Sequence, residues 1–91
     1  MRTARQLERH FKGVANHWRI DILLLVANNE GIVLDVIAKT LGGNFKTIAE
    51  HIRRLVHAGL VDKKYQGRQV AHSLSPYGKK MIACIRTFSL S

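Results

Sequence analysis

Apolar residues recur at helical spacing between positions 33 and 60, and this segment organises the chain. Residues 33–41 carry apolar side chains three and four positions apart, which predicts a short helix. Residues 45–58 place Ile48, Ile52 and Leu55 on one side of a 3.6-residue repeat, which predicts a longer helix. A Gly-Gly-Asn sequence lies between them; glycine ends helices readily, and the asparagine side chain can cap the next helix. The pattern predicts a helix-turn-helix.

Two further helices are predicted before this motif. In residues 3–15 the apolar positions continue towards Trp18 at heptad-like spacing, provided that the helix does not break near Gly13 and Asn16. Residues 17–28 are apolar on both sides, so this helix should lie at the centre of the domain or between the domain and a partner. Ile32 and Val33 can form a short strand before the motif.

After position 60 the periodicity changes from helix to strand. Residues 60–65 and 69–74 are short runs rich in strand-forming residues, and Gly67 permits a tight turn between them. A β-hairpin that directly follows the second helix of a helix-turn-helix is a wing, here residues 62–70. Ser75 and Pro76 then signal the start of a last helix, because serine caps helices and proline suits their first position.

Composition and charge narrow the class of protein. The 91 residues fit one domain, residues 1–91, and 46% of them are hydrophobic. No apolar run approaches the roughly 18 residues that a membrane span needs, and the charged N-terminus lacks the apolar core of a signal peptide. With a single cysteine, this predicts a cytoplasmic protein. The net charge of +9 favours a polyanionic partner, nucleic acid or an anionic membrane surface; a merely solvated surface is the alternative.

The ordered motifs resemble the ArsR-type winged-helix regulators, close relatives of the MarR type. The similarity covers NHWRIDILLLVANNEG, LGGNFKTIAEHIRRLVHAGLV and YQGRQVAHSLSPYGKK, which is nearly the whole chain. The resemblance implies a mainly α fold of five helices with a small β-hairpin wing. It also implies a homodimer formed through the first and last helices, and a regulator that binds double-stranded DNA.

The residues independently suggest where each partner would bind. Phosphate and base contacts are expected from the helix at 44–58 and from the wing. These DNA-binding candidates are Asn44, Lys46, Thr47, Glu50, His51, Arg53, Arg54, Lys63, Lys64, Gln66, Arg68 and Gln69. Apolar stripes on the first and last helices are expected to form the dimer. These interface candidates are Leu7, Phe11, Val14, Trp18, Tyr77, Met81, Cys84, Ile85 and Phe88. The alternative is that the stripes cover each other within one subunit. Phe45 could contact a thymine methyl group, but we expect it in the core.

Metal and catalytic sites are not expected. Residues 34–41 hold no cysteine or histidine, and residues 76–89 hold no histidine, aspartate or glutamate, so the usual positions of metal ligands in the resembling family are empty. The carboxylates are scattered, and there is no phosphate-binding glycine loop. Cys84 is expected to be a buried small hydrophobe, although a thiol near a two-fold axis could link two subunits. No cofactor is predicted.

These observations predict a homodimeric, sequence-specific DNA-binding transcriptional regulator, expected to be a repressor. Two alternatives remain open at this point. The winged helix could be a protein-interaction module whose basic face meets an acidic partner, or it could bind DNA without sequence preference, as chromatin proteins do.

Overall fold

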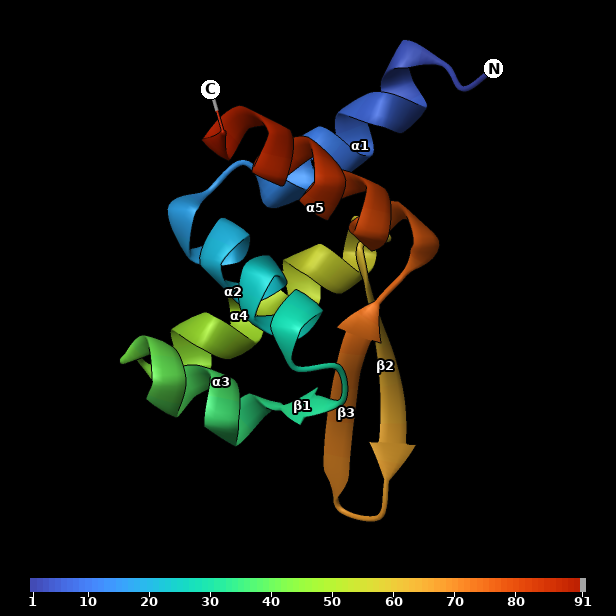
Figure 1. Ribbon diagram of the computed structural model, residues 1–91. Coiled ribbons are helices and arrows are strands. Elements are labelled where there is room, and N and C mark those ends of the chain that lie inside the picture. The colour runs from blue at the N-terminus through green and yellow to red at the C-terminus, as the bar shows by residue number, and fades with distance from the viewer. Residues whose placement is uncertain (91) are drawn as a thin grey trace.

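The computed structural model describes residues 1–90, which form five helices and three strands (Figure 1). The helices are α1 (Ala4–Val14), α2 (His17–Asn28), α3 (Leu34–Leu41), α4 (Phe45–His57) and α5 (Pro76–Ser89). The strands are β1 (Ile32–Val33), β2 (Val61–Gln66) and β3 (Gln69–Leu74). This order confirms the predicted fold class, a mainly α winged helix-turn-helix.

Side-chain caps set most of the helix boundaries. The Asn44 side chain accepts hydrogen bonds from the backbone N–H groups of Lys46 (3.0 Å) and Thr47 (3.3 Å), so α4 begins where the sequence predicts. Ser75 Oγ accepts the Gly78 N–H at 3.0 Å, with proline at the first position of α5. Gly42 ends α3 in the left-handed conformation, at φ 67°.

The α3 helix begins one residue later than predicted. Val33 belongs to β1, which pairs antiparallel with β3 so that Ile32 lies opposite His72 and Val33 opposite Ala71. The sheet order is β1-β3-β2. The helix start carries no side-chain cap, so pairing with β3 decides where the strand ends and the helix begins.

The apolar seam predicted through the first helix is interrupted. α1 ends at Val14, and the Asn16 side chain accepts the Arg19 N–H at 3.3 Å to cap a new helix. Trp18 therefore lies on α2 and not on a continuation of α1. It sits beside the turn between α3 and α4, where a Cβ placed on Gly43 would lie 3.2 Å from the Trp18 ring. A cap at Asn16 outweighs the continuing apolar spacing.

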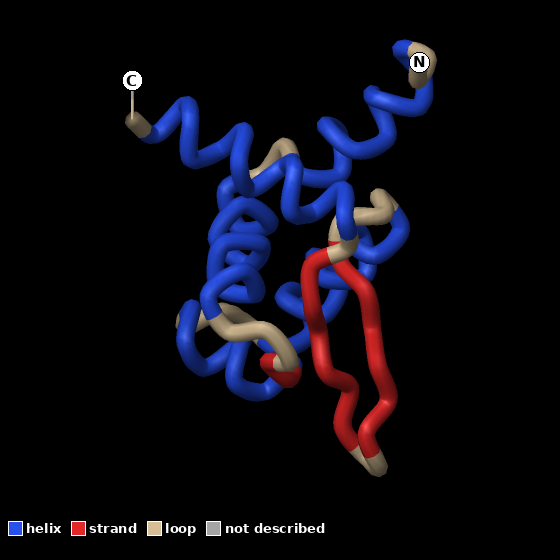
Figure 2. The backbone as a smooth tube through the Cα atoms, turned by 45° about the vertical axis from the view of Figure 1, so that its right-hand side comes forward, coloured by secondary structure: helices blue, strands red, loops and turns tan. Residues whose placement is uncertain are grey.

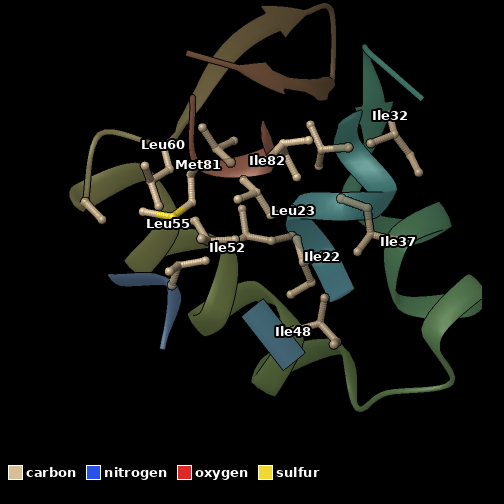
Figure 3. Packing of buried hydrophobic residues seen from close by; sticks show 14 of the residues in the cluster. Ile22, Leu23, Ile32, Ile37, Ile48, Ile52, Leu55, Leu60, Met81 and Ile82 are labelled. Carbon is tan, nitrogen blue, oxygen red and sulfur yellow. The ribbon is translucent and has the colours of Figure 1, made fainter. Parts of the chain in front are cut away.

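The core is built around α2. Ile22, Leu23 and Val26 are fully buried there, and they belong to one cluster with Ile48 and Leu55 of α4 (Figure 3). The predicted central position of this helix is confirmed. The apolar side of α4 is buried against α2. This burial fixes the orientation of α4, because the opposite side of that helix must then face solvent.

The first and last helices and the hairpin tip lie at opposite ends of the molecule. α1 and α5 lie together at one end, while the β2–β3 hairpin extends away from them (Figures 1 and 2). A partner seated on α1 and α5 therefore leaves the hairpin tip uncovered.

Candidate nucleic-acid interface

α4 turns its apolar side inward and its cations outward. Ile48, Ile52 and Leu55 are buried, whereas Lys46 and Arg53 are exposed. The helix therefore has the two-sided arrangement that its sequence predicts. We call the exposed cations of α4 and of the hairpin the basic face; its members are Lys46, Arg53, Arg54, Lys63, Lys64 and Arg68.

An ion-pair cluster holds the middle of this helix surface. Arg53 donates two hydrogen bonds to the Glu50 carboxylate, at 2.9 and 2.6 Å, and Arg54 Nε lies 3.6 Å from the same carboxylate. The hydrogen bond from Arg53 lowers the pKa of Glu50, and the same contact raises the pKa of Arg53. Glu50 must therefore give up contacts within its own helix before it can accept a hydrogen bond from a base.

The first turn of α4 presents the candidate base-reading groups. The Asn44 side-chain oxygen already accepts the backbone N–H groups of Lys46 and Thr47. Its amide NH₂ is therefore the part that could meet a base edge. Lys46 and Thr47 have exposed side chains. Helix-turn-helix proteins read bases mainly from the N-terminal residues of this helix.

His51 is held inside the contact between α2 and α4. Arg19 Nη1 lies 3.2 Å from His51 Nδ1, which fits an Arg19 donor and a neutral imidazole acceptor. Burial lowers the pKa of His51, and the positive charges of Arg19 and Arg54 lower it further. Of the candidates on α4, His51 is the one already engaged by a neighbouring helix.

The hairpin projects polar and cationic side chains into solvent. Lys63, Lys64, Gln66, Arg68 and Gln69 are all exposed. Lys63 is opposite His72 and Lys64 is opposite Ala71, so the two lysines lie on opposite faces of the hairpin. Gly67 supplies the positive φ, 64°, that the tight turn requires.

The expectation that Phe45 folds into the core is wrong. Its side chain is 51% exposed, and it borders a groove between α4, β1 and the hairpin that Lys63 and Arg68 also line. Its spacing from Ile48 and Ile52 matches the buried stripe, but Phe45 does not join the core cluster that contains those two residues. An exposed aromatic ring at this position could meet a thymine methyl group.

The candidate dimer residues divide into core and surface. Val14 and Met81 are buried in the chain's own core, and Ile85 packs partly against it. In contrast, Leu7 is 43%, Phe11 52%, Tyr77 42% and Phe88 76% exposed. Cys84 is half-buried. We call the four exposed residues the apolar face; it carries less of the predicted stripe than the sequence suggested.

Residues 1–90 bring no three His, Cys, Asp or Glu side chains into a group that could hold a metal ion. None of the described helices is both long and apolar enough to cross a lipid bilayer.

No family model and no curated protein matches the chain. Solved structures do match. The homodimeric winged helix-turn-helix DNA-binding domain of Mb0332 from Mycobacterium bovis, a possible ArsR-family transcriptional regulator, is 26% identical. It aligns with a TM-score of 0.83 over 93% of this chain and 79% of that one.

Two further structures have the same fold at lower identity. HlyU from Vibrio cholerae is 22% identical with a TM-score of 0.85, over 97% of this chain and 96% of that one. NolR from Sinorhizobium fredii is 19% identical with a TM-score of 0.82, over 93% of this chain and 85% of that one. The chain therefore shares the winged helix-turn-helix fold of ArsR-type transcriptional regulators.

Proposed function

We propose that this chain is a homodimeric transcriptional regulator that binds double-stranded DNA in a sequence-specific way. The observation that carries the proposal is the orientation of α4, which buries its isoleucines and turns Lys46, Arg53 and Arg54 towards solvent beside a cationic hairpin. α4 enters the major groove, and the hairpin lies on the backbone or in the minor groove.

Affinity and sequence choice come from different side chains in this proposal. The cations of the basic face neutralise phosphates and release counterions, which strengthens binding to any sequence. Asn44, Lys46, Thr47 and Glu50 read base edges, since asparagine suits adenine, lysine suits guanine and glutamate suits cytosine. Gln66 and Gln69 flank the hairpin tip, where Arg68 can enter a minor groove.

The apolar face supports the homodimer. Four large apolar side chains at the α1–α5 end are exposed, which is costly in water unless another surface covers them. The similar domain of Mb0332 is described as homodimeric and DNA-binding. A symmetric pair would present two α4 helices to two half-sites about one helical turn apart.

The proposal also covers the domain, the location and the mode of action. We expect residues 1–91 to act as one domain in the cytoplasm and without catalysis. Repression is the expected mode, because a dimer seated on promoter DNA blocks access to it.

A selection of genomic fragments by the purified dimer tests the function. We expect recovery of fragments with an inverted repeat, and anisotropy titrations should show tighter binding to them than to random duplex. The affinity should fall linearly with the logarithm of salt concentration. Lys46→Ala should weaken binding, whereas Lys79→Ala on α5 should not. Absence of binding to any duplex at low salt would refute the DNA proposal and favour an acidic protein partner. Equal affinity for all fragments would refute sequence specificity.

A further inference from the structure

A cationic cleft adjoins the basic face and shares Arg53 and Arg54 with it. It is a cleft of about 280 Å³ between α1, the start of α2 and the last turns of α4. Its walls carry Arg9, Lys12, Arg19, Arg53 and Arg54, together with His57. The Arg9 side chain reaches the backbone carbonyl of His57, which is 48 positions away in sequence, so linear spacing does not reveal the cluster.

The floor of this cleft is a close crossing of two helices. A Cβ placed on Gly13 would lie 2.1 Å from the Ala58 Cβ, so α1 approaches the end of α4 as closely as a glycine allows. Arg9 strengthens the crossing, because its Nε and Nη2 donate to the His57 carbonyl oxygen at 2.9 and 2.6 Å. The cations of α1 are thereby held next to those of α4.

The cleft has more positive charge than its own carboxylates balance. Among residues 1–90, the ion pairs of its lining cations are Glu8 with Lys12 at 3.1 Å, and Glu50 with Arg53 and Arg54. Both carboxylates are exposed at the rim. Arg19 Nε is buried without a hydrogen-bond partner among the described residues. Five permanent cations therefore face two carboxylates, and the cleft is suited to an anion.

The length of α4 indicates which anion reaches the cleft. A helix of 13 residues is about 20 Å long, whereas the major groove of B-DNA is about 12 Å wide. When α4 enters the groove by its first turns and lies across it at an angle, its last turns come over a sugar–phosphate backbone. Arg53, Arg54 and the α1 cations are carried by, or held against, those last turns.

We propose that the α1–α4 cleft binds phosphodiester groups of the same duplex whose major groove receives α4. This inference rests on the proposed DNA-binding function and extends its contact surface to α1. It makes α1 a DNA-contacting helix as well as part of the apolar face. The cleft contributes affinity and register but no base reading, because only phosphates reach it.

Lys12 is the sharpest position for a test. Within residues 1–90 it pairs with Glu8, in an exposed ion pair that contributes little to stability, so its replacement should leave the fold intact. Lys12→Gln should weaken binding to a selected site about three- to fivefold. It should also reduce the slope of log affinity against log salt by about 0.9 for each phosphate contact, or about two for a dimer with two clefts. Sequence preference should not change.

Three variants make the result decisive. Lys12→Arg should restore the wild-type slope, Lys12→Glu should weaken binding further, and Lys79→Gln should match the wild type. Circular dichroism and thermal unfolding confirm that each variant is folded. Ethylation of single phosphates should interfere beside the α4 contact in the wild type and less in Lys12→Gln.

The outcomes separate the two proposals. If the wild type binds no duplex, the proposed function fails and this inference falls with it. If the wild type binds and Lys46→Ala weakens it, but both Lys12→Gln and Lys12→Glu keep the wild-type slope, the function stands and the cleft is not a phosphate site.

Discussion

The basic face and the apolar face are both exposed, but they demand different partners. The basic face has charges that water and salt can solvate, so it is stable when unoccupied and gains affinity only for a polyanion. The apolar face exposes Leu7, Phe11, Tyr77 and Phe88, which water solvates poorly. If the proposed function holds, one small chain separates a self-association through apolar surface from a salt-sensitive contact through charged surface.

α1 joins the two faces. Leu7 and Phe11 lie on its apolar side, whereas Arg9 and Lys12 line the cleft beside α4. His10 lies between them: its ring stacks on Tyr77 with centroids 4.7 Å apart, and its Nδ1 lies 2.5 Å from the Ala58 carbonyl oxygen. A change in how two subunits pack at α1 would therefore reach the end of α4 directly.

The largest effect is expected when a charge is introduced into the apolar face. Phe11→Asp should convert a dimer to a folded monomer, because Phe11 is half-exposed within one chain but would be covered in a dimer. Loss of the second α4 should weaken DNA binding about 100-fold or more through lost avidity. Sedimentation equilibrium and anisotropy titrations measure the two effects. Val36→Asp, at an exposed residue of α3, should leave the oligomeric state unchanged. A Phe11→Asp protein that remains dimeric would show that the interface lies elsewhere.

The link between the faces can be weakened at the helix crossing. Gly13→Ala should lower the free energy of unfolding by about 2 kcal/mol, because the new methyl group would overlap the Ala58 methyl group. Urea denaturation measures the loss. The double variant Gly13→Ala with Ala58→Gly removes that overlap and should recover much of the stability, less about 1 kcal/mol for glycine near the helix end. Equal instability of the single and double variants would contradict this account of the crossing.

The capping and reading roles of Asn44 can be separated. Asn44→Ala should lower the free energy of unfolding by about 1 kcal/mol, because it removes the acceptor for Lys46 and Thr47 N–H. Asn44→Asp keeps an acceptor and should keep the stability, but its charge should weaken DNA binding. Thermal unfolding and anisotropy, measured on both variants, distinguish the roles. If Asn44→Asp binds DNA as the wild type does, the first turn of α4 does not lie against the DNA.

The smallest effect is expected from the protonation of His72, which is buried on β3. Burial is the largest cause that lowers the pKa of His72; the hydrogen bond with the Ile32 carbonyl opposes it, and the Lys63 charge adds to it. The unfolded chain therefore binds a proton at higher pH than the folded chain. The free energy of unfolding should fall as pH drops below 6.5, until the folded form is protonated as well.

Urea denaturation between pH 7.5 and pH 5 checks this slope, and His72→Gln should make it shallower. Some pH dependence of the free energy of unfolding should remain in that variant, because the pKa of His51 is lowered as well. An unchanged slope in His72→Gln would show that His72 stays solvated.

Local signals predicted most of the fold. The isoleucine spacing of α4, the caps at Asn44 and Ser75, and the glycine at the hairpin turn act within a few residues of chain. Their energetics are local, so they can be read from the sequence directly. The apolar seam from α1 to Trp18 was expected only if the helix did not break near Gly13 and Asn16, and the Asn16 cap does break it.

The sequence by itself determined which segments are amphipathic and, where a side chain caps the helix, where that helix begins. Only the tertiary structure decided which apolar side chains become core and which become surface. Val14 and Met81 are buried while Phe11 and Phe45 are exposed, although all four lie on apolar stripes. It also brought Arg9, Lys12 and Arg19 beside α4. The physical reason is that burial and charge clustering depend on which helices cross, and a crossing such as Gly13 on Ala58 is set by packing between distant segments.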